Sequence, residues 1–266
     1  QKVEDPTVES VSNVPDPIAL QEIEFKNVCF SYSDDGPDVL KNVSFKLKKG
    51  DRLALVGTTG SGKSTIIRLL AKTYTGYRGS IKINGTELSE IPIAQVRETI
   101  SVMHQEIFMF NDTVEFNIAL GRKNISQTDV EQAASFVYAS RFIDQLPGGY
   151  RFVIQDNGDN LSKGQAQLIS FARAIAGNSE LIILDEATSA VDSITEQYIQ
   201  QAIANIFSTK TVIAVAHRLS TIRNSDLILV LEDGQIIERG THTELLEHGG
   251  KYARLLHQIE AEHKQN

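Results

Sequence analysis

One glycine-rich segment restricts the fold of this chain more than any other feature. It fits the pattern G-x-x-x-x-G-K-[ST] and reads Gly57, Thr58, Thr59, Gly60, Ser61, Gly62, Lys63, Ser64, Thr65. A short apolar run, 52–56, precedes it, and apolar residues at helical spacing, 66–70, follow it. Glycines let backbone N–H groups close around phosphate oxygens, and a helix N-terminus adds partial positive charge. The pattern predicts a strand, a phosphate-binding loop and a helix; a plain glycine-rich turn is the alternative.

The residue types in and beyond this loop suggest roles in nucleoside triphosphate chemistry. We expect the Lys63 ammonium to contact the β- and γ-phosphates and the Ser64 hydroxyl to ligate Mg²⁺. Asp185 ends an apolar run, which suits a contact to Mg²⁺, direct or through water. Glu186 follows and is a candidate general base for the attacking water. An acidic pair opening a helix is the alternative, and the loop alone does not separate a kinase, a GTPase and an ATPase.

Strand-like and helix-like runs alternate along the 266 residues, which predicts an α/β fold with a mainly parallel sheet. The expected strands are 22–31, 43–47, 52–56, 80–83, 99–103, 181–184, 211–216 and 227–231. The stretch of about 106–160 changes to helical character, and Ser126 with Asp129 forms a capping box there. We interpret it as an inserted helical subdomain. We further expect a linker over 1–20, the main domain over 21–266 and one final helix from about 243 to 261.

Composition limits the classes of partner. The net charge of −8 argues against broad nucleic-acid binding, which needs a basic face. No window reaches the roughly 20 apolar residues of a membrane helix, and no signal peptide is recognisable, so the chain as given is expected to be soluble. The single cysteine, Cys29, fits a reducing cytoplasm.

A second motif defines the kind of nucleotide-using protein. Leu161-Ser162-Lys163-Gly164-Gln165 lies shortly before the strand that ends at Asp185, and another strand runs into His217. Ser162 and Gln165 also form a capping box, which predicts that a helix begins there. We expect this helix to end at about 176. A capped helix N-terminus can face an anion.

Together these motifs resemble ABC transporter ATPases, from about Ile23 onward. The resemblance implies a RecA-like core carrying an N-terminal antiparallel β region and a helical subdomain. It also implies two such domains that hold two ATP molecules head to tail, so that Leu161–Gln165 serves the partner's ATP. By the same resemblance, the chain acts at the cytoplasmic face of a cell membrane.

The resemblance assigns further roles residue by residue. Tyr32 matches the aromatic residue that stacks on adenine, and Val39 is placed with the nucleotide-binding residues. Gln105 matches the glutamine that reaches Mg²⁺ and the attacking water, and His217 matches the histidine that contacts the γ-phosphate. The segment called the D-loop corresponds to Ser189, Ala190, Val191, Asp192. Taken singly, Tyr32, Gln105 and His217 also suit a strand aromatic, a surface amide and a structural histidine.

Within the family the exporter type fits best. The stretch Phe110–Val114 with Asn117-Ile118 resembles the part of exporters that faces the transmembrane coupling helices. Two departures stand out: Lys163 replaces the usual first glycine of the signature, and Asp156-Asn157-Gly158 stands where exporters carry Glu-Arg-Gly. Because Glu186 and His217 are intact, this profile favours one half of a heterodimer over a homodimer.

Three hypotheses compete. The leading one is an exporter ATPase domain that uses ATP and Mg²⁺ and works with a transmembrane domain. A non-transport ABC ATPase acting on DNA or the ribosome would need a coiled-coil insertion, a second cassette or a basic face, none of which the sequence contains. A regulatory module that binds ATP with little turnover is favoured only by the altered signature.

Overall fold

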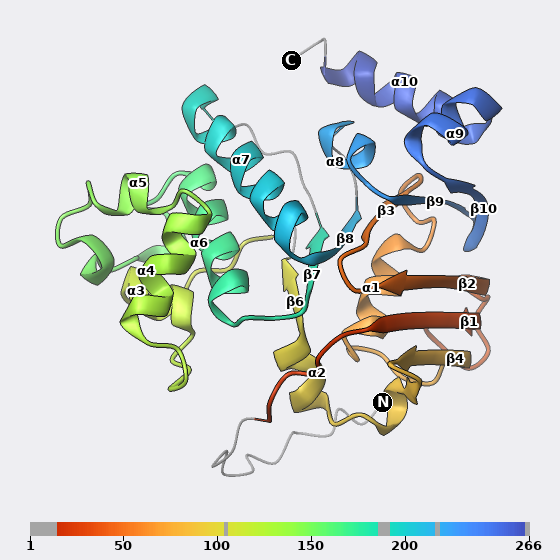
Figure 1. Cartoon of the computed structure of the whole chain (residues 1–266), viewed down its shortest axis with the longest axis horizontal. Coiled ribbons are helices and arrows are strands. Elements are labelled where there is room, and N and C mark those ends of the chain that lie inside the picture. Colours follow the sequence, from red (N-terminus) through yellow and green to blue (C-terminus); the bar gives the residue numbers. More distant parts are fainter. Residues whose placement is uncertain (1–14, 104–105, 186–191, 216–218, 264–266) are drawn as a thin grey trace.

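The computed structural model describes residues 15–103, 106–185, 192–215 and 219–263, and Figure 1 shows two lobes. A six-stranded sheet forms the centre, in the order β10-β9-β3-β8-β7-β6. Its strands are β6 (Ile100–Met103), β7 (Leu181–Asp185), β8 (Thr211–Val215), β3 (Arg52–Val56), β9 (Leu227–Glu232) and β10 (Gln235–Gly240). The first five are parallel to one another, and only β10 pairs antiparallel, at one edge. The predicted mainly parallel α/β sheet is confirmed.

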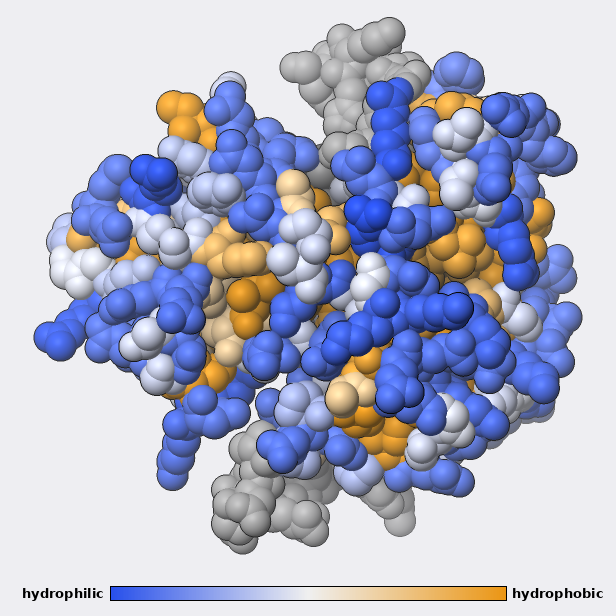
Figure 2. Space-filling model, in the orientation of Figure 1, coloured by the Kyte–Doolittle hydropathy of each residue, from blue (hydrophilic) through white to orange (hydrophobic). Residues whose placement is uncertain are grey.

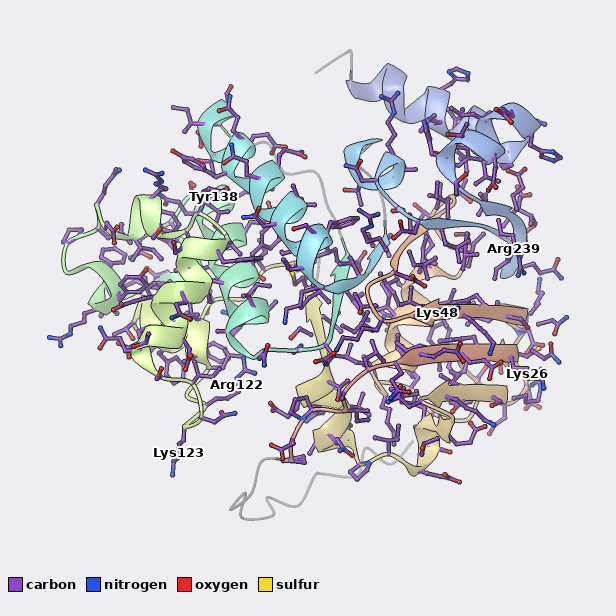
Figure 3. The ribbon with its side chains drawn as sticks, in the orientation of Figure 1. Lys26, Lys48, Arg122, Lys123, Tyr138 and Arg239 are labelled. Atoms are coloured by element: carbon purple, nitrogen blue, oxygen red, sulfur yellow. The ribbon has the colours of Figure 1, made fainter. Side chains whose placement is uncertain are left out.

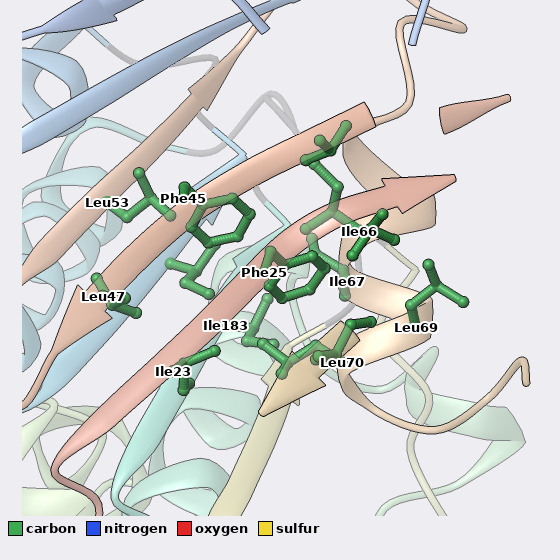
Figure 4. Close-up of a cluster of buried hydrophobic side chains, with 14 of the residues drawn as sticks. Ile23, Phe25, Phe45, Leu47, Leu53, Ile66, Ile67, Leu69, Leu70 and Ile183 are labelled. Atoms are coloured by element: carbon green, nitrogen blue, oxygen red, sulfur yellow. The ribbon is translucent and has the colours of Figure 1, made fainter. Parts of the chain in front are cut away.

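A smaller antiparallel sheet packs beside this centre, in the order β2-β1-β4-β5. Its strands are β1 (Glu22–Phe30), β2 (Leu40–Lys48), β4 (Arg78–Ile83) and β5 (Thr86–Glu87), with a turn η1 (Leu88–Glu90) after them. Phe25 on β1 and Phe45 on β2 stack with ring centroids 4.5 Å apart. Figure 4 shows these rings over apolar side chains of α1 (Lys63–Leu70) and of the central sheet, so the two sheets share one core.

The other lobe consists mainly of helices. They are α3 (Val114–Ala119), α4 (Gln127–Phe136), α5 (Ser140–Ile143) and α6 (Lys163–Ala176), with the turns η2 (Gly149–Arg151) and η3 (Asp156–Gly158) between α5 and α6. Both predicted capping boxes are present, Ser126 with Asp129 on α4 and Ser162 with Gln165 on α6. A second apolar core joins this lobe to α7 (Ser193–Thr209) and to β7 and β8.

The C-terminal segment forms two helices, so the expectation of one helix over about 243–261 is wrong. Gly249 takes a left-handed conformation, φ 65°, and ends α9 (His242–His248). The Glu238 carboxylate then accepts the backbone N–H groups of Lys251 and Tyr252 at the start of α10 (Lys251–His263). The short helix α8 (Leu219–Arg223) lies between β8 and β9.

The residues that precede β1 pack against the domain. Leu20 is 1% exposed, and the Ile18 N–H donates to Thr99 Oγ1 at 2.8 Å, where α2 (Ile93–Thr99) meets β6. Asn84 donates from Nδ2 to the Ala19 carbonyl at 2.9 Å. Among the described residues, no helix has both the length and the apolar content needed to span a bilayer. The face in Figure 2 is mostly hydrophilic, with apolar residues in several separate patches.

Candidate nucleotide-binding site

The loop Gly57–Thr65 joins β3 to α1 and depends on glycine at two points. A Cβ at Gly57 would collide with the carbonyl oxygen of Leu231 on the neighbouring strand β9. Gly62 is the N-cap of α1 with φ 106°, and a Cβ there would lie 2.7 Å from a side-chain carbon of Leu40. No side chain caps the N-terminus of α1, whereas α4, α6 and α9 each begin with a capping box. The N–H groups of Thr65 and Ile66 both donate to the Gly62 carbonyl at 3.1 Å. Those of Lys63 and Ser64 have no acceptor among the described residues, as an anion site requires.

Lys63 lies inside the curve of this loop. The residue is 8% exposed, and Nζ donates to the carbonyl oxygens of Gly57 at 2.7 Å and Thr58 at 2.8 Å. Burial lowers the pKa of Lys63, and the nearby Asp185 carboxylate opposes that shift. Ser64, the next residue, is exposed, so its hydroxyl is free to meet a cation. The acceptors of this ammonium are neutral carbonyl oxygens, and the phosphate oxygens of a triphosphate would be stronger, anionic acceptors for it.

Four neighbouring parallel strands, β3, β8, β7 and β6, end at the same edge of the sheet. Asp185 at the end of β7 is half-buried and lies in register with Val215 at the end of β8. The predicted residues Gln105, Glu186 and His217, and Ser189, Ala190 and Val191 of the D-loop, lie outside the described residues. The strands that lead to Gln105, Glu186 and His217 thus belong to the same parallel sheet as β3, which leads into the glycine loop, and β8 pairs with β3 directly.

Tyr32 and Val39 lie beside the first turn of α1. The Tyr32 hydroxyl is 2.8 Å from Thr65 Oγ1, and 44% of the residue is exposed. The Val39 N–H donates to the Phe30 carbonyl at 2.7 Å and closes the base of the loop that carries Tyr32. The structure therefore brings both predicted residues next to the glycine loop.

The predicted signature opens α6 in the helical lobe, whereas α1 lies beside the antiparallel sheet (Figure 1). Ser162 Oγ accepts the N–H of Gln165 at 3.2 Å, and Gln165 Oε1 accepts the N–H of Ser162 at 2.9 Å. Gly164 is buried, Lys163 is exposed, and Leu161 packs against the core of the lobe. Asp192, the described residue of the D-loop, caps α7 by accepting the N–H of Thr195 at 2.9 Å, which lowers the pKa of Asp192.

Sequence reasoning missed a polar junction between α6 and the segment after Gln105. Arg173 donates to the Phe108 carbonyl at 3.0 Å and to the Asn117 carbonyl at 2.8 Å. Burial lowers the pKa of Arg173 to about 10, and the neighbouring guanidinium of Arg122 adds to that shift. An arginine within the otherwise apolar run of α6 was the available signal.

Asn117 organises the stretch that was expected to face a partner. It is fully buried, accepts the Phe110 N–H at 2.8 Å and donates to the Phe110 carbonyl at 2.9 Å. Val114 and Ile118 are fully buried as well, so they support the stretch from inside. Phe110 and its neighbour Phe108, 42% and 56% exposed, form the outward part.

A pocket of about 490 Å³ opens beside Phe108. Its lining includes Arg97, Phe108, Leu120, Arg122 and Arg173. Figure 3 labels Arg122 and Lys123 on the loop that follows α3. Glu98 and Glu106 also line it, so the pocket combines one aromatic ring with side chains of both charges.

A glycine loop after a parallel strand, a buried lysine within it and an acid at the end of a nearby strand define a P-loop nucleotide-binding domain. The sequence comparison specifies the class. Residues 40–189 match the model of the family described as ABC transporter. This chain belongs to the ABC transporter family, and that membership implies ATP binding.

Relatives and solved structures agree with this membership. The chain is 45% identical over 240 residues to the "ATP-dependent lipid A-core flippase" of Photobacterium profundum, covering 90% of this chain and 41% of the relative. It is 44% identical over 238 residues to the protein of the same name from Escherichia coli K12, covering 89% and 41%. The solved structure of a bacterial Atm1-family ABC exporter with ATP bound superimposes with a TM-score of 0.83 at 38% identity, covering 94% of this chain and 44% of the exporter. The chain thus spans less than half the length of these relatives, and the predicted ABC ATPase fold is confirmed.

Proposed function

We propose that this chain is the ATP-hydrolysing domain of an ABC exporter. The observation that carries the proposal is the glycine loop, whose helix α1 lacks a side-chain cap and whose Lys63 is buried among carbonyl oxygens. The phosphates would accept hydrogen bonds from the N–H groups of Lys63 and Ser64 and from the Lys63 ammonium. Tyr32 would stack on the adenine beside the first turn of the helix.

Hydrolysis needs an activated water and a stabilised γ-phosphate. We assign the general base to Glu186, directly after the strand end at Asp185, and the γ-phosphate contact to His217. Ser64, Gln105 and Asp185 would hold Mg²⁺, whose charge offsets that of the phosphate oxygens. The exposed Ser64 hydroxyl and the half-buried Asp185 carboxylate supply the oxygen ligands that Mg²⁺ prefers.

A second ABC ATPase domain would complete each site. The signature lies on the helical lobe and α1 on the other lobe, which supports service to a partner's ATP. The exposed Lys163, in place of a glycine, favours an unequal pair, and so does the segment Asp156-Asn157-Gly158. Its Asn157 N–H donates to Asn111 Oδ1 at 2.9 Å, next to the exposed Phe110.

A transmembrane domain is the other partner we propose, at the cytoplasmic face of the inner membrane. The 490 Å³ pocket lined by Phe108 would receive its coupling segment. The flippase name of the relatives makes an amphipathic lipid the leading class of substrate, and the transmembrane domain would select it.

Steady-state ATP hydrolysis by the chain tests the proposal, alone and mixed with candidate partner chains, in wild-type and Glu186→Gln forms. We expect measurable turnover by the wild-type chain, at least with a partner. In E186Q turnover should fall about 100-fold or more while ATP binding is kept, since general-base catalysis contributes about 10²–10⁴-fold. Unchanged turnover in E186Q would remove Glu186 from the mechanism. ATP binding without turnover under every pairing would favour the regulatory module instead.

A further inference from the structure

Three aromatic rings form a closed cluster beside the glycine loop, and a role has been proposed for Tyr32 alone among them. Phe30, at the end of β1, is 3% exposed and meets Tyr32 edge to face at 5.1 Å. Tyr74 meets Tyr32 at 5.2 Å with an interplanar angle of 78°. Phe30 and Tyr74 complete the triangle at 5.9 Å. Each ring therefore contacts the other two.

The backbone holds Tyr74 at the far end of α1. Lys72 takes a left-handed conformation, φ 53°, just after the helix, and its ammonium donates to the Ile91 carbonyl at 2.6 Å. The Tyr74 N–H lies 3.4 Å from the Arg68 carbonyl of the last helical turn. Tyr74 is thus tied to the same helix whose N-terminus forms the phosphate site, and 38% of it stays exposed.

Tyr32 needs this support because its own loop supplies little. Residues 33–35 are exposed, and no residue between Phe30 and Leu40 is buried. Its ring is fixed at three points: Phe30, Tyr74 and the Thr65 hydroxyl. Neither ring neighbour stacks parallel to Tyr32, so parallel stacking is left to a nucleotide base.

We propose that Tyr74 is a positioning residue that orients Tyr32 for stacking on the base and thereby adds affinity for ATP over a bare triphosphate chain. The inference rests on the proposed function, in which Tyr32 contacts adenine. Tyr74 reaches the base only through Tyr32. Its loss should therefore weaken the base contact and leave the phosphate contacts of the glycine loop intact.

Two ligands separate these effects in the whole chain: ATP and inorganic tripolyphosphate, each measured by isothermal titration calorimetry. We expect Tyr74→Ala to weaken ATP binding about three- to tenfold, the size of an aromatic pair contribution. Tripolyphosphate affinity should stay unchanged. Tyr74→Phe keeps the ring and should bind both ligands like the wild type. Tyr74→Leu replaces Y74A if that variant does not fold.

Three results would overturn the inference: unchanged ATP affinity in the ring-less variant, an equal loss for both ligands, or a Y74F variant as weak as Y74A. Tyr32→Ala is the companion measurement, and an unchanged ATP affinity there would overturn the inference while leaving the ATPase proposal standing. Failure of the wild-type chain to bind ATP would instead overturn both, and it is visible before any variant is made.

Discussion

Replacing Lys63 by methionine should separate the role of its ammonium in ATP binding from its role in the fold. In the structure Lys63 is 8% exposed, and its Nζ donates to two carbonyl oxygens of the loop. The lowered pKa shows that burial disfavours the charged ammonium, so the charge itself costs folding free energy near neutral pH. Methionine removes that cost and keeps most of the buried volume.

Two opposing changes fix the expected stability of K63M. The Gly57 and Thr58 carbonyls lose their donor, at about 1–3 kcal/mol for an unsatisfied buried polar group. Removal of the buried charge offsets part of this cost, so we expect a net change within about 1.5 kcal/mol. ATP binding should suffer far more. Two lost charge-assisted contacts to phosphate, at about 1.5–3 kcal/mol each, predict an affinity loss of about 100-fold or greater.

Lys210→Met is the matched control. Burial also lowers the pKa of Lys210, and its ammonium donates to the Ser179 carbonyl at 3.1 Å. Lys210 directly precedes β8, at the edge of the sheet opposite the glycine loop. Urea unfolding and calorimetry with MgATP on both variants give the test. An affinity loss below tenfold in K63M, or a similar loss in K210M, would refute the assignment.

Three further substitutions probe other parts of the domain. Asn117→Ala should lower the free energy of unfolding by about 2–4 kcal/mol in urea unfolding, because Phe110 loses both backbone partners; a change below about 1 kcal/mol would contradict this. Ser162→Ala should cost about 1 kcal/mol through the lost cap of α6, with ATP affinity of the isolated chain unchanged by calorimetry. Burial raises the pKa of Tyr252 to about 12, so stability should fall as pH rises from about 10 toward 12. Between pH 9 and 11 the free energy of unfolding of Tyr252→Phe should fall by about 1 kcal/mol less than that of the wild type. Equal falls would refute the assignment of this pH dependence to Tyr252.

The parts predicted correctly depend on short stretches of sequence. The capping boxes of α4 and α6 each involve residues three positions apart, and both are present. The glycine loop lies between a strand and a helix, as its flanking patterns require. Asp185 ends its strand because the apolar run before it ends there.

The parts that were missed depend on contacts between distant segments. The break after α9 is stabilised by Glu238, which caps α10 from strand β10. Arg173 bonds the carbonyls of Phe108 and Asn117, 65 and 56 positions away in the chain. Strand β10 lies at the sheet edge, with alternately exposed and half-buried residues, and so lacks the apolar run that identified the other strands. Local patterns contain no information on such pairings.

The anchoring of residues 16–20 determines where mechanical tension enters the domain. Ile18 is bonded to Thr99 and the Asp16 carbonyl to Gln95, both on α2, while β1 begins only at Glu22. A pull on the chain before Asp16 therefore loads the junction of α2 and β6 before it loads the antiparallel sheet. Strand β6 is only four residues long and leads to Gln105, which we assign to the nucleotide site. By that assignment, a force from outside the domain and the bound nucleotide would act on the two ends of the same strand.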